Sequence, residues 1–411
     1  MNVRRFQDIN LKNKRVLLRV DFNVTMKDGK IDDDTRIVQT LPTIKHLIKN
    51  GAKTIIVSHL GRPKGKDKSL NLTPIAKHLS KLLKKPVLKL DSCVGPEVTK
   101  AVKAMKPGEV IMLENIRFYP EEEKNSAPFA KKLAALADIF VADSFGTAHR
   151  AHASTYGVAK YLPAYAGFLI QKEVNVLGQL LDKCPRPMTL IVGGAKIDTK
   201  IGLIQNFVTK ADYFLIGGGL ANTFLAAEGF DVGKSLFEAD KIEVAQDTML
   251  KAESFKENFV LPEDVVVADE IQEKASTLDL PVEDVLGDMK ILDIGKRSIR
   301  KFIHVIEKSK IVVWNGPVGL FEMKPFAHGT RMIAKALANA KGVKTIIGGG
   351  DTIDAIKHFG FSEKDFTHVS TGGGAMLEFL EGEMLPGIKI LLDKKKNTKK
   401  SAKKAVKKGK K

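Results

Sequence analysis

The chain has 411 residues, of which 44% are hydrophobic and 28% are charged, proportions that are ordinary for a soluble enzyme with room for two domains. No apolar run approaches the length of a membrane span, and the first ten residues lack the apolar core of a secretory signal. The net charge of +19 falls to +8 without the 11 lysines of residues 394–411, so we expect a moderately basic body and a disordered, lysine-rich tail.

In the first 165 residues, short β-branched apolar runs alternate with amphipathic segments. Strands are expected at residues 16–20, 54–60, 110–115 and 139–144. Helical patterns are expected at residues 35–49, 72–84 and 126–137. This alternation predicts a parallel sheet covered by helices on both faces.

A second series of strands begins after residue 185. Its members are expected at residues 189–194, 213–218, 291–295, 311–316, 345–350 and 367–371. Helical patterns follow most of them. The expected fold class is therefore α/β, with two doubly wound, Rossmann-like parallel-sheet domains joined by a helix.

The joining helix is expected at residues 167–182, whose apolar positions fit a helix largely in contact with protein. Two prolines, Pro185 and Pro187, end it. The expected divisions are 1–165 with a returning segment at 383–393, an interdomain helix at 166–184, a second domain at 185–382 and the tail at 394–411.

The strand ends of the first series carry arginine and histidine, and ligands of open α/β sheets bind at the carboxyl ends of strands. These side chains are Arg19, His59, Arg62, Arg117, His149, Arg150 and His152, with Arg36 as a fifth arginine in a helical pattern. A guanidinium fork binds carboxylate and phosphate bidentately, so the first domain is expected to bind a small, strongly anionic molecule. We interpret the histidines as anion ligands or as side chains that support them.

The strand ends of the second series carry glycine. They are Gly193, Gly194, Gly217 to Gly219, Gly316, Gly348 to Gly350 and Gly372 to Gly374. Glycine lets phosphate approach the backbone, and a following helix supplies oriented N–H donors. One such motif alone would be a tight turn, but several in one half favour a nucleotide, with Asp351 placed to hold Mg²⁺.

Three further patterns bear on the ligand. Lys196 and Lys200 would share one face of a helix, where they either neutralise phosphate or begin a solvated helix. Residues 229–235, GFDVGKS, have three residues between the glycines where a P-loop needs four. No G-x-G-x-x-G fingerprint is present, which disfavours an NAD-dependent dehydrogenase, although that class stays an alternative. The two cysteines, Cys93 and Cys184, are expected to be reduced thiols of a cytoplasmic protein.

The longer motifs occur in an order that belongs to one family. They are RVDFNV, DDTRI, SHLGRP, LENIRF, FGTAHRAHAS, WNGPVGLFE, IGGGDT and VSTGGGA. Over residues 1–390 the chain resembles the phosphoglycerate kinase family in its shorter, bacterial form. The resemblance implies a two-domain kinase of glycolysis that transfers a phosphoryl group reversibly between 1,3-bisphosphoglycerate and ADP, giving 3-phosphoglycerate and ATP, with Mg²⁺. We expect a monomer.

The resemblance also implies site residues. For 3-phosphoglycerate they are Asp21, Phe22, Asn23, Arg36, His59, Leu60, Gly61, Arg62, Arg117 and Arg150. For ATP or ADP they are Lys200, Gly218, Gly219, Asn315, Glu322, Gly348, Gly349, Gly350, Asp351 and Thr352, with Glu322 on the ribose hydroxyls and Asp351 on the metal. The catalytic set around the transferring phosphoryl group is Arg36, Lys196, Gly372 and Gly373.

The reaction needs no general base. In the ATP-consuming direction the nucleophile is a carboxylate, whose pKa of roughly 3.5 leaves it ionised at neutral pH. Catalysis is therefore expected from alignment and charge neutralisation after the domains close. As a hypothesis, Glu173 on the joining helix pairs with His368 and links this helix to the nucleotide site.

Three residues depart from the family pattern: Thr25 replaces a common proline, Asp198 a common serine and Glu383 a common lysine. Asp198 adds negative charge near nucleotide phosphate and is expected to weaken affinity. The lysine tail lies beyond the family's end. It is either an inert extension or a non-specific ligand for nucleic acid or an anionic membrane, with strong salt dependence.

Overall fold

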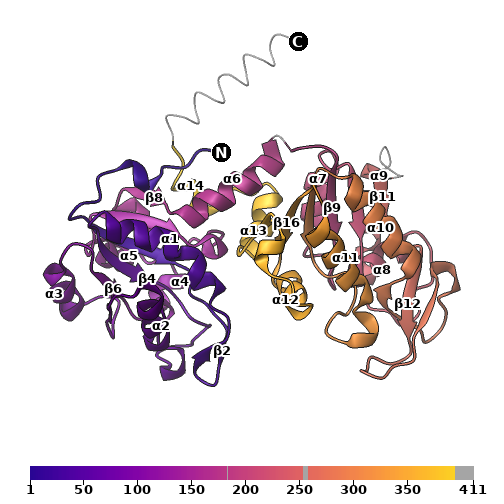
Figure 1. Cartoon of the computed structure of the whole chain (residues 1–411), viewed down its shortest axis with the longest axis horizontal. Helices are drawn as coiled ribbons and strands as arrows, with labels where there is room; N and C mark the ends of the chain where they lie inside the picture. Colours follow the sequence, from indigo (N-terminus) through magenta and orange to yellow (C-terminus); the bar gives the residue numbers. More distant parts are fainter. Residues whose placement is uncertain (183, 253–257, 394–411) are drawn as a thin grey trace, which may run out of the picture. The chain divides into compact units, whose positions relative to one another are not determined.

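The computed structural model describes residues 1–182, 184–252 and 258–393, so the expected lysine-rich tail lies outside the described residues. The chain forms two compact units (Figure 1). Unit 1 is Met1–Gly178 with the segment that begins at Met384, and unit 2 is Gln179–Glu383. Helix α6 (Phe168–Asp182) contains the point of division.

Unit 1 is built on a six-stranded parallel sheet. Its order is β5 (Val87–Lys89), β6 (Val110–Met112), β4 (Lys53–Val57), β1 (Arg15–Val20), β7 (Ile139–Asp143) and β8 (Ala164–Ala166). In the central register, Leu18 lies opposite Ile56 on one side and Val141 on the other, and all three are buried. The continuous apolar run of β1 reflects a strand covered on both faces.

The helices of unit 1 follow the strands. They are α1 (Thr35–Lys49), α2 (Thr73–Leu83), α3 (Pro96–Ala104), α4 (Pro120–Glu123), α5 (Ala127–Ala134), α6 and α14 (Pro386–Lys389), and a small hairpin joins β2 (Met26–Lys27) to β3 (Lys30–Ile31). Helix α1 has the limits expected from the sequence. One face of this helix is buried in the core of unit 1 and includes Ile37, Ile44 and Leu47. This packing holds the helix against the sheet.

Unit 2 contains a second six-stranded parallel sheet. Its order is β11 (Phe259–Val260), β10 (Tyr213–Ile216), β9 (Met188–Val192), β15 (Ile311–Asn315), β16 (Lys344–Gly348) and β17 (His368–Val369). The strand order reverses between β9 and β15, and in unit 1 it reverses between β1 and β7. Ligands of doubly wound sheets bind at the carboxyl ends of strands at such reversals, so these two places are where a site is sought.

The helices of unit 2 are α7 (Ile201–Phe207), α8 (Gly218–Ala227), α9 (Ile242–Lys251), α10 (Lys296–Lys308), α11 (His328–Asn339), α12 (Gly350–His358) and α13 (Gly374–Leu380). Trp314 of β15 is fully buried, and Phe302 of α10 and Ile333 of α11 belong to the same apolar core. No helix in the described part of the chain is both long and apolar enough to cross a membrane.

One expected strand belongs to a different sheet. The run expected at 291–295 is β14 (Lys290–Ile294), which pairs antiparallel with β12 (Asp264–Ala268) beside β13 (Leu278–Pro281). The sequence placed it in the parallel series, and that placement was wrong. A short apolar run looks alike in both kinds of sheet, and only the first three residues of β14, which are partly exposed, hint at a one-sided strand.

Candidate active site

At the carboxyl end of β1, Asp21 and Arg36 form an ion pair. Arg36 Nη1 donates to Asp21 Oδ2 at 2.6 Å, and Asp21 is buried. Arg36 is the second residue of α1, so the helix start fixes its position. Asp21 Oδ1 also accepts the amide of Asn23 at 3.2 Å, which turns the chain after the strand. About a third of the Arg36 side chain, 36%, stays accessible to a ligand.

His59 follows β4 and is held by Arg19 on β1. Arg19 Nη2 lies 3.2 Å from His59 Nδ1, and a guanidinium can only donate, so Nδ1 accepts. Asp21 Oδ1 is 3.7 Å from the same nitrogen, which is beyond hydrogen-bond distance. The proton of neutral His59 therefore sits on Nε2, where it is a donor for an anionic ligand.

Burial and the surrounding positive charge keep His59 neutral. Burial and the positive charges of Arg19, Arg117, Arg36 and Arg150 lower its pKa well below the ordinary value. His59 is thus a neutral hydrogen-bond donor at physiological pH, whereas the arginines supply the positive charge. Two of these guanidiniums are placed by direct contacts: Arg19 lies against the His59 ring, and Arg36 lies against Asp21.

Arg19 is fully enclosed and faces away from solvent. Its Nε donates to Ser154 Oγ at 2.9 Å, and Ser154 Oγ donates to Glu122 Oε1 at 2.6 Å. Burial raises the pKa of Glu122, and the charge of Arg19 opposes that rise. The sequence marked Arg19 as a strand-end arginine, but nothing in it linked Ser154 or Glu122 to the site, since their roles depend on contacts across the fold.

The loop after β4 is fastened by two of the expected residues. Gly61 N donates to Asn23 Oδ1 at 2.8 Å, and Arg117 Nη1 donates to Gly61 O at 2.6 Å. Gly61 has a φ of +64°, and a Cβ there would lie 2.9 Å from a Leu70 methyl carbon. Only glycine suits this turn. Arg62 is exposed and forms no ion pair within the described residues.

Other expected residues of unit 1 lie in the same neighbourhood. Phe22 is buried and its amide donates to Ser58 Oγ at 2.9 Å, while the Leu60 amide lies 3.3 Å from Asn115 Oδ1. Arg150 Nε donates to His149 Nε2 at 3.2 Å. Burial, chiefly, lowers the pKa of His152 to about 4, so this histidine too is neutral.

In unit 2, several of the expected phosphate-binding glycines also allow neighbouring backbones to pack closely. A Cβ on Gly193 would lie 2.2 Å from Pro317 O, and one on Gly316 would lie 2.1 Å from Gly193 O. A Cβ on Gly218 would lie 2.7 Å from Gly194 O. At these positions the neighbouring backbone leaves no room for a side chain. The sequence pattern alone could not distinguish this structural requirement for glycine from a role in ligand binding.

Other glycines leave open space. A Cβ on Gly350, Gly373 or Gly374 would meet no atom within 4 Å. Gly349 precedes the nine-residue helix α12 and has a φ of +96°, which glycine adopts easily. The first backbone N–H groups of a helix point out of its N-terminal end, where a phosphate can bind. The amide of Gly372 donates to Ser370 Oγ at 3.1 Å.

Lys200 and Asn315 meet at the end of β15. Lys200 Nζ donates to Asn315 Oδ1. Burial lowers the pKa of Lys200, and the negative charges of Asp351 and Glu381 act in the opposite direction, which places Asp351 near the ammonium. Thr352 Oγ1 accepts the Gly316 amide at 2.7 Å and so ties the start of α12 to the loop after β15.

A cavity of about 580 Å³ lies beside these groups, within unit 2. Its lining includes four residues expected to bind the nucleotide: Gly218, Gly219, Glu322 and Asp351. Apolar side chains complete the wall, among them Leu236, Ile271 and Val318. Leu236 and Ile271 are 60% and 49% exposed, so they offer an apolar surface to a flat ligand.

Lys196 does not share a helix face with Lys200. Residues 197–200 form a turn, and α7 begins at Ile201. Lys196 is exposed. Asp198 of this turn pairs with Lys241 Nζ at 2.9 Å, so its extra negative charge has a cation beside it.

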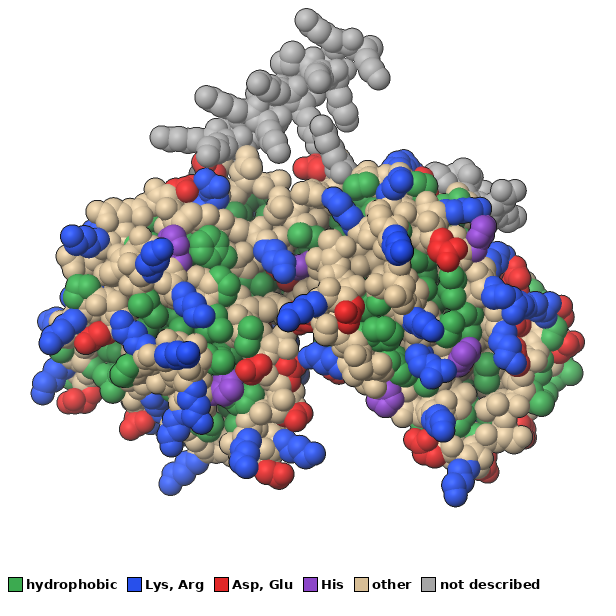
Figure 2. Space-filling model, viewed as in Figure 1, with side chains coloured by type: hydrophobic (Ala, Val, Ile, Leu, Met, Phe, Trp, Pro, Cys, Tyr) green, Lys and Arg blue, Asp and Glu red, His purple; other side chains and the backbone are tan. Residues whose placement is uncertain are grey.

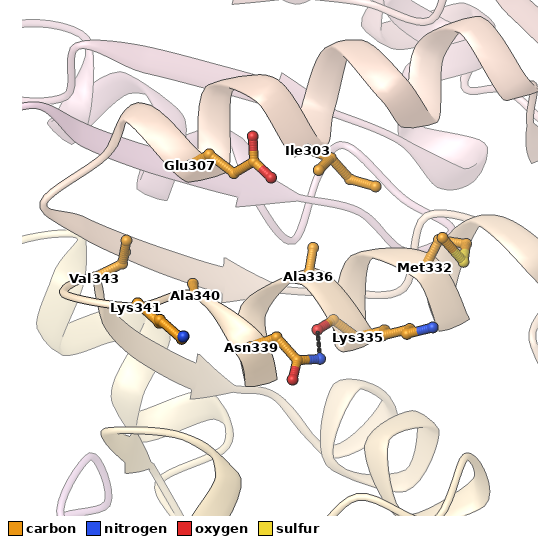
Figure 3. Close-up of a pocket in the computed structure, with 9 residues that line it drawn as sticks. All are labelled: Ile303, Glu307, Met332, Lys335, Ala336, Asn339, Ala340, Lys341 and Val343. Atoms are coloured by element: carbon orange, nitrogen blue, oxygen red, sulfur yellow. Dashed lines mark hydrogen bonds between the residues drawn. The ribbon is translucent and has the colours of Figure 1, made fainter.

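A second hollow, of about 440 Å³, lies between α10 and α11 (Figure 3). Ile303 of α10 and Met332 and Ala336 of α11 contribute apolar side chains to its lining, and none of its lining residues is an expected site residue. On the face drawn in Figure 2, Lys and Arg side chains are spread among acidic ones rather than gathered over one element.

Converging arginines around a neutral histidine suit a small polyanion, and a glycine-rich cavity with a lysine and a carboxylate suits a nucleotide. Together they define the parts of an α/β phosphotransferase. A family model described as phosphoglycerate kinase matches residues 6–383, and the chain belongs to the phosphoglycerate kinase family. This finding supports phosphoryl transfer over the dehydrogenase alternative.

Individual relatives agree. The chain is 53% identical over 388 residues to the phosphoglycerate kinase of Dictyoglomus turgidum, covering 94% of this chain and 98% of that protein. It is 53% identical over 389 residues to that of Pelotomaculum thermopropionicum, with the same coverage. The structure of phosphoglycerate kinase from Coxiella burnetii superposes with a TM-score of 0.86 at 42% identity, covering 95% of this chain and 98% of that one. The family's substrates are 3-phosphoglycerate and a nucleotide, for which a metal ion is generally needed.

Proposed function

We propose that unit 1 binds 3-phosphoglycerate and that unit 2 binds ATP or ADP. The observation that carries the first assignment is the cluster of arginines around His59: Arg19 contacts its ring, Arg36 pairs with Asp21 and Arg117 binds Gly61 O, and the charges of these three and of Arg150 act on His59. A ligand with a phosphate and a carboxylate matches both this charge and the bidentate geometry of guanidinium groups. His59 Nε2–H adds one neutral donor, and Arg62 is free to swing toward the ligand.

In unit 2 we assign the ends of the cavity to different parts of the nucleotide. Leu236, Ile271 and Val318 offer apolar contact to the base, and Glu322 offers a carboxylate to the ribose hydroxyls. Lys200 and the turn at Gly349 and Gly350, where Gly350 leaves open space, are suited to the phosphates. The remaining expected residues, Asn315 and Thr352, hold Lys200 and the helix start in place.

Asp351 is our candidate for the metal site. It lines the cavity in the first turn of α12, beside Lys200. The described residues contain no group of three or more His, Cys, Asp or Glu side chains arranged to hold a metal. One carboxylate fits Mg²⁺, which is usually held by one or two carboxylates together with substrate phosphates. When bound there, Mg²⁺ would neutralise phosphate charge.

The residues around the reacting groups act by position and charge. The acceptor carboxylate of 3-phosphoglycerate is already ionised at neutral pH, so the reaction needs no general base. His59 is neutral and acts as a hydrogen-bond donor rather than as an acid or a base. Arg36 carries a partly accessible cation at the end of β1 and is proposed to stabilise the transferring phosphoryl group with Lys196 and the amides of Gly372 and Gly373. Alignment of the two substrates supplies about 7–11 kcal/mol of barrier reduction in well-oriented systems.

Transfer between two units requires them to close on their substrates, which would also exclude water. Glu173 is buried on α6 and His368 is buried at the first position of β17, and their pairing as a link stays a prediction. Small-angle scattering with both substrates present tests this prediction. If Glu173→Ala closes to the same extent as the wild type, the Glu173–His368 pair does not contribute to closure.

The test of the proposed site is the rate of ATP-dependent phosphorylation of 3-phosphoglycerate. Arg36→Ala should lose about 100-fold or more, because a cation at the phosphoryl group is lost. Arg15→Ala is the matched control, since Arg15 also forms a 2.6 Å ion pair, with Asp138, away from the proposed site. Equal rates in the two variants would overturn the role of Arg36.

We further propose that the protein is a cytoplasmic monomer, in keeping with its family's metabolic reaction. Binding of polyanions by the lysine tail concerns residues outside the described part of the chain and stays a prediction from sequence.

A further inference from the structure

Glu322, the proposed ribose ligand, lies on the irregular segment between β15 and α11. This segment is fastened at its beginning by Thr330 of α11, whose Oγ1 accepts the amides of Val318 and Gly319 at 3.1 and 3.2 Å. The Leu320 amide donates to the backbone oxygen of Leu292 on β14 at 2.9 Å. The carboxylate is therefore placed by contacts with α11 and β14.

The residue after Leu292 is Asp293, a carboxylate that is 2% exposed and lines the nucleotide cavity. Its Oδ2 accepts the amide of Gly329, in the first turn of α11, at 2.7 Å, and its Oδ1 accepts the amide of Ile294 at 2.9 Å. Both oxygens are thus engaged by backbone donors.

The Glu322 segment also rests on this carboxylate. A Cβ on Gly319 would lie 2.1 Å from Asp293 Oδ1, and one on Gly329 would lie 2.3 Å from it. Side chains at these two positions would displace the carboxylate or the segment. One buried group therefore touches the strand, the helix start and the segment that carries Glu322.

We propose that Asp293 is a positioning residue for nucleotide binding, which fixes the Glu322 segment by joining β14 to the start of α11. This inference rests on the proposed role of Glu322. Burial, the largest cause, raises the pKa of Asp293 well above its ordinary value, as expected for a carboxylate enclosed by backbone amides without a cation.

Helix capping alone would make Asp293 structural, and the chain offers a matched case. Asp264 on β12 is also buried, accepts the amides of Arg297 and Ser298 at 2.7 Å each, and so caps α10. A Cβ on Gly295 would lie 2.3 Å from the Asp264 carboxyl carbon. The cavity wall includes Val265 but not Asp264.

The experiment compares Asp293→Asn with Asp264→Asn in the full chain, measuring KM for ATP, KM for 3-phosphoglycerate, kcat and Tm. Asparagine keeps the size but can accept from only one of the two amides. Asp293→Asn should raise the KM for ATP on the order of three- to tenfold and leave the KM for 3-phosphoglycerate unchanged. Asp264→Asn should lower Tm by about as much as Asp293→Asn does, but it should leave the KM for ATP unchanged.

Glu322→Ala and the double variant separate the inference from the role on which it rests. Glu322→Ala should raise the KM for ATP, and adding Asp293→Asn should then raise it little further. A full additional rise, or an equal rise in both KM values, would overturn the positioning role. An unchanged KM for ATP in Glu322→Ala would overturn the ribose role and the inference together. If Asp293→Asn does not fold, Gly319→Ala should show the same selective rise, because its Cβ would disrupt the contact between the segment and the Asp293 carboxylate. Its absence would overturn the inference.

Discussion

The guanidinium of Arg19 donates to Nδ1 of His59 at 3.2 Å, and this contact decides which nitrogen of the histidine carries its proton. Arg19 is itself enclosed, with Ser154 and Glu122 behind it. The two residues form an inner layer of the arginine cluster. Arg19 orients the ring and leaves the Nε2–H of His59 as the donor that we propose for the ligand.

This contact predicts the titration of His59. In the wild type His59 should stay neutral from pH 8 to pH 6, because burial and four nearby arginines lower its pKa. Arg19→Met should raise that pKa, since one positive charge is removed, and should raise the KM for 3-phosphoglycerate. Imidazole ¹⁵N chemical shifts report both tautomer and protonation. Arg15→Met, which leaves His59 untouched, is the control, and an Nδ1-protonated ring in the wild type would contradict the assignment.

A second prediction concerns Asp143, which caps the start of α6. Its Oδ1 accepts the amides of Leu169 and Ile170 at 2.8 and 3.3 Å, and burial raises its pKa from 3.8 to about 7. Between these two values the folded state holds the proton more tightly than the unfolded chain, so this group's contribution to stability falls as pH rises from about 4 to about 7. The shift corresponds to at most about 4 kcal/mol.

Asp143→Asn should therefore gain stability relative to wild type as pH is raised from 5 to 8, measured by urea midpoints. Asp138→Asn is the control, because the hydrogen bond from Arg15 lowers the pKa of Asp138 and its effect should be flat over this range. A constant difference between Asp143→Asn and wild type across the range would show that Asp143 does not titrate there.

A third prediction concerns the departure at Asp198. Lys241→Ala removes the cation beside Asp198, which leaves its negative charge uncompensated near the proposed phosphate site, and should therefore raise the KM for ATP. The rise should be only about two- to threefold, because exposed ion pairs contribute little free energy. Asp198→Ser should cancel this rise in the double variant. Lys301→Ala, which breaks an exposed pair with Glu263 elsewhere in unit 2, is the control. A rise that persists in the double variant would assign the effect to Lys241 itself.

The lysine tail gives a fourth prediction. Truncation after Asp393 removes 11 positive charges and should abolish salt-sensitive retention on DNA, with kcat unchanged. Retention is measured on a DNA column over a salt gradient. Retention that survives truncation would place any polyanion binding on the body of the protein.

The sequence predicted nine of the twelve described strands in the two parallel sheets, because most of their apolar runs are long and end in recognisable residues. It missed β5, β8 and β11, which are only two or three residues long. Helix α1 was predicted to the residue, since its apolar face has a clear period. Strand β14 was assigned to the wrong sheet because hydrophobic pattern does not report strand direction. The sequence did not decide whether residues 197–200 form a helix or a turn, because the spacing of Lys196 and Lys200 alone does not fix the backbone conformation.

The candidate site divides in the same way. The arginines were visible because they follow strands. The supporting carboxylates of Glu122 and Asp293 were not, because their partners Ser154 and Gly329 lie 32 and 36 residues away. Glycine was ambiguous: Gly350 leaves room for a ligand and Gly316 makes room for a neighbouring backbone, and both look alike in sequence.

The route of the chain through the two units has a consequence for folding during synthesis. Unit 2 is one continuous stretch, whereas unit 1 includes a segment that follows it. That late segment is tied in by the bridge between Val3 and Leu392 and by the Gly387 amide, which donates to Ala148 O at 2.8 Å. On the ribosome, the whole sequence of unit 2 is made before the last segment of unit 1 has been synthesised. The unit that starts first is thus completed last.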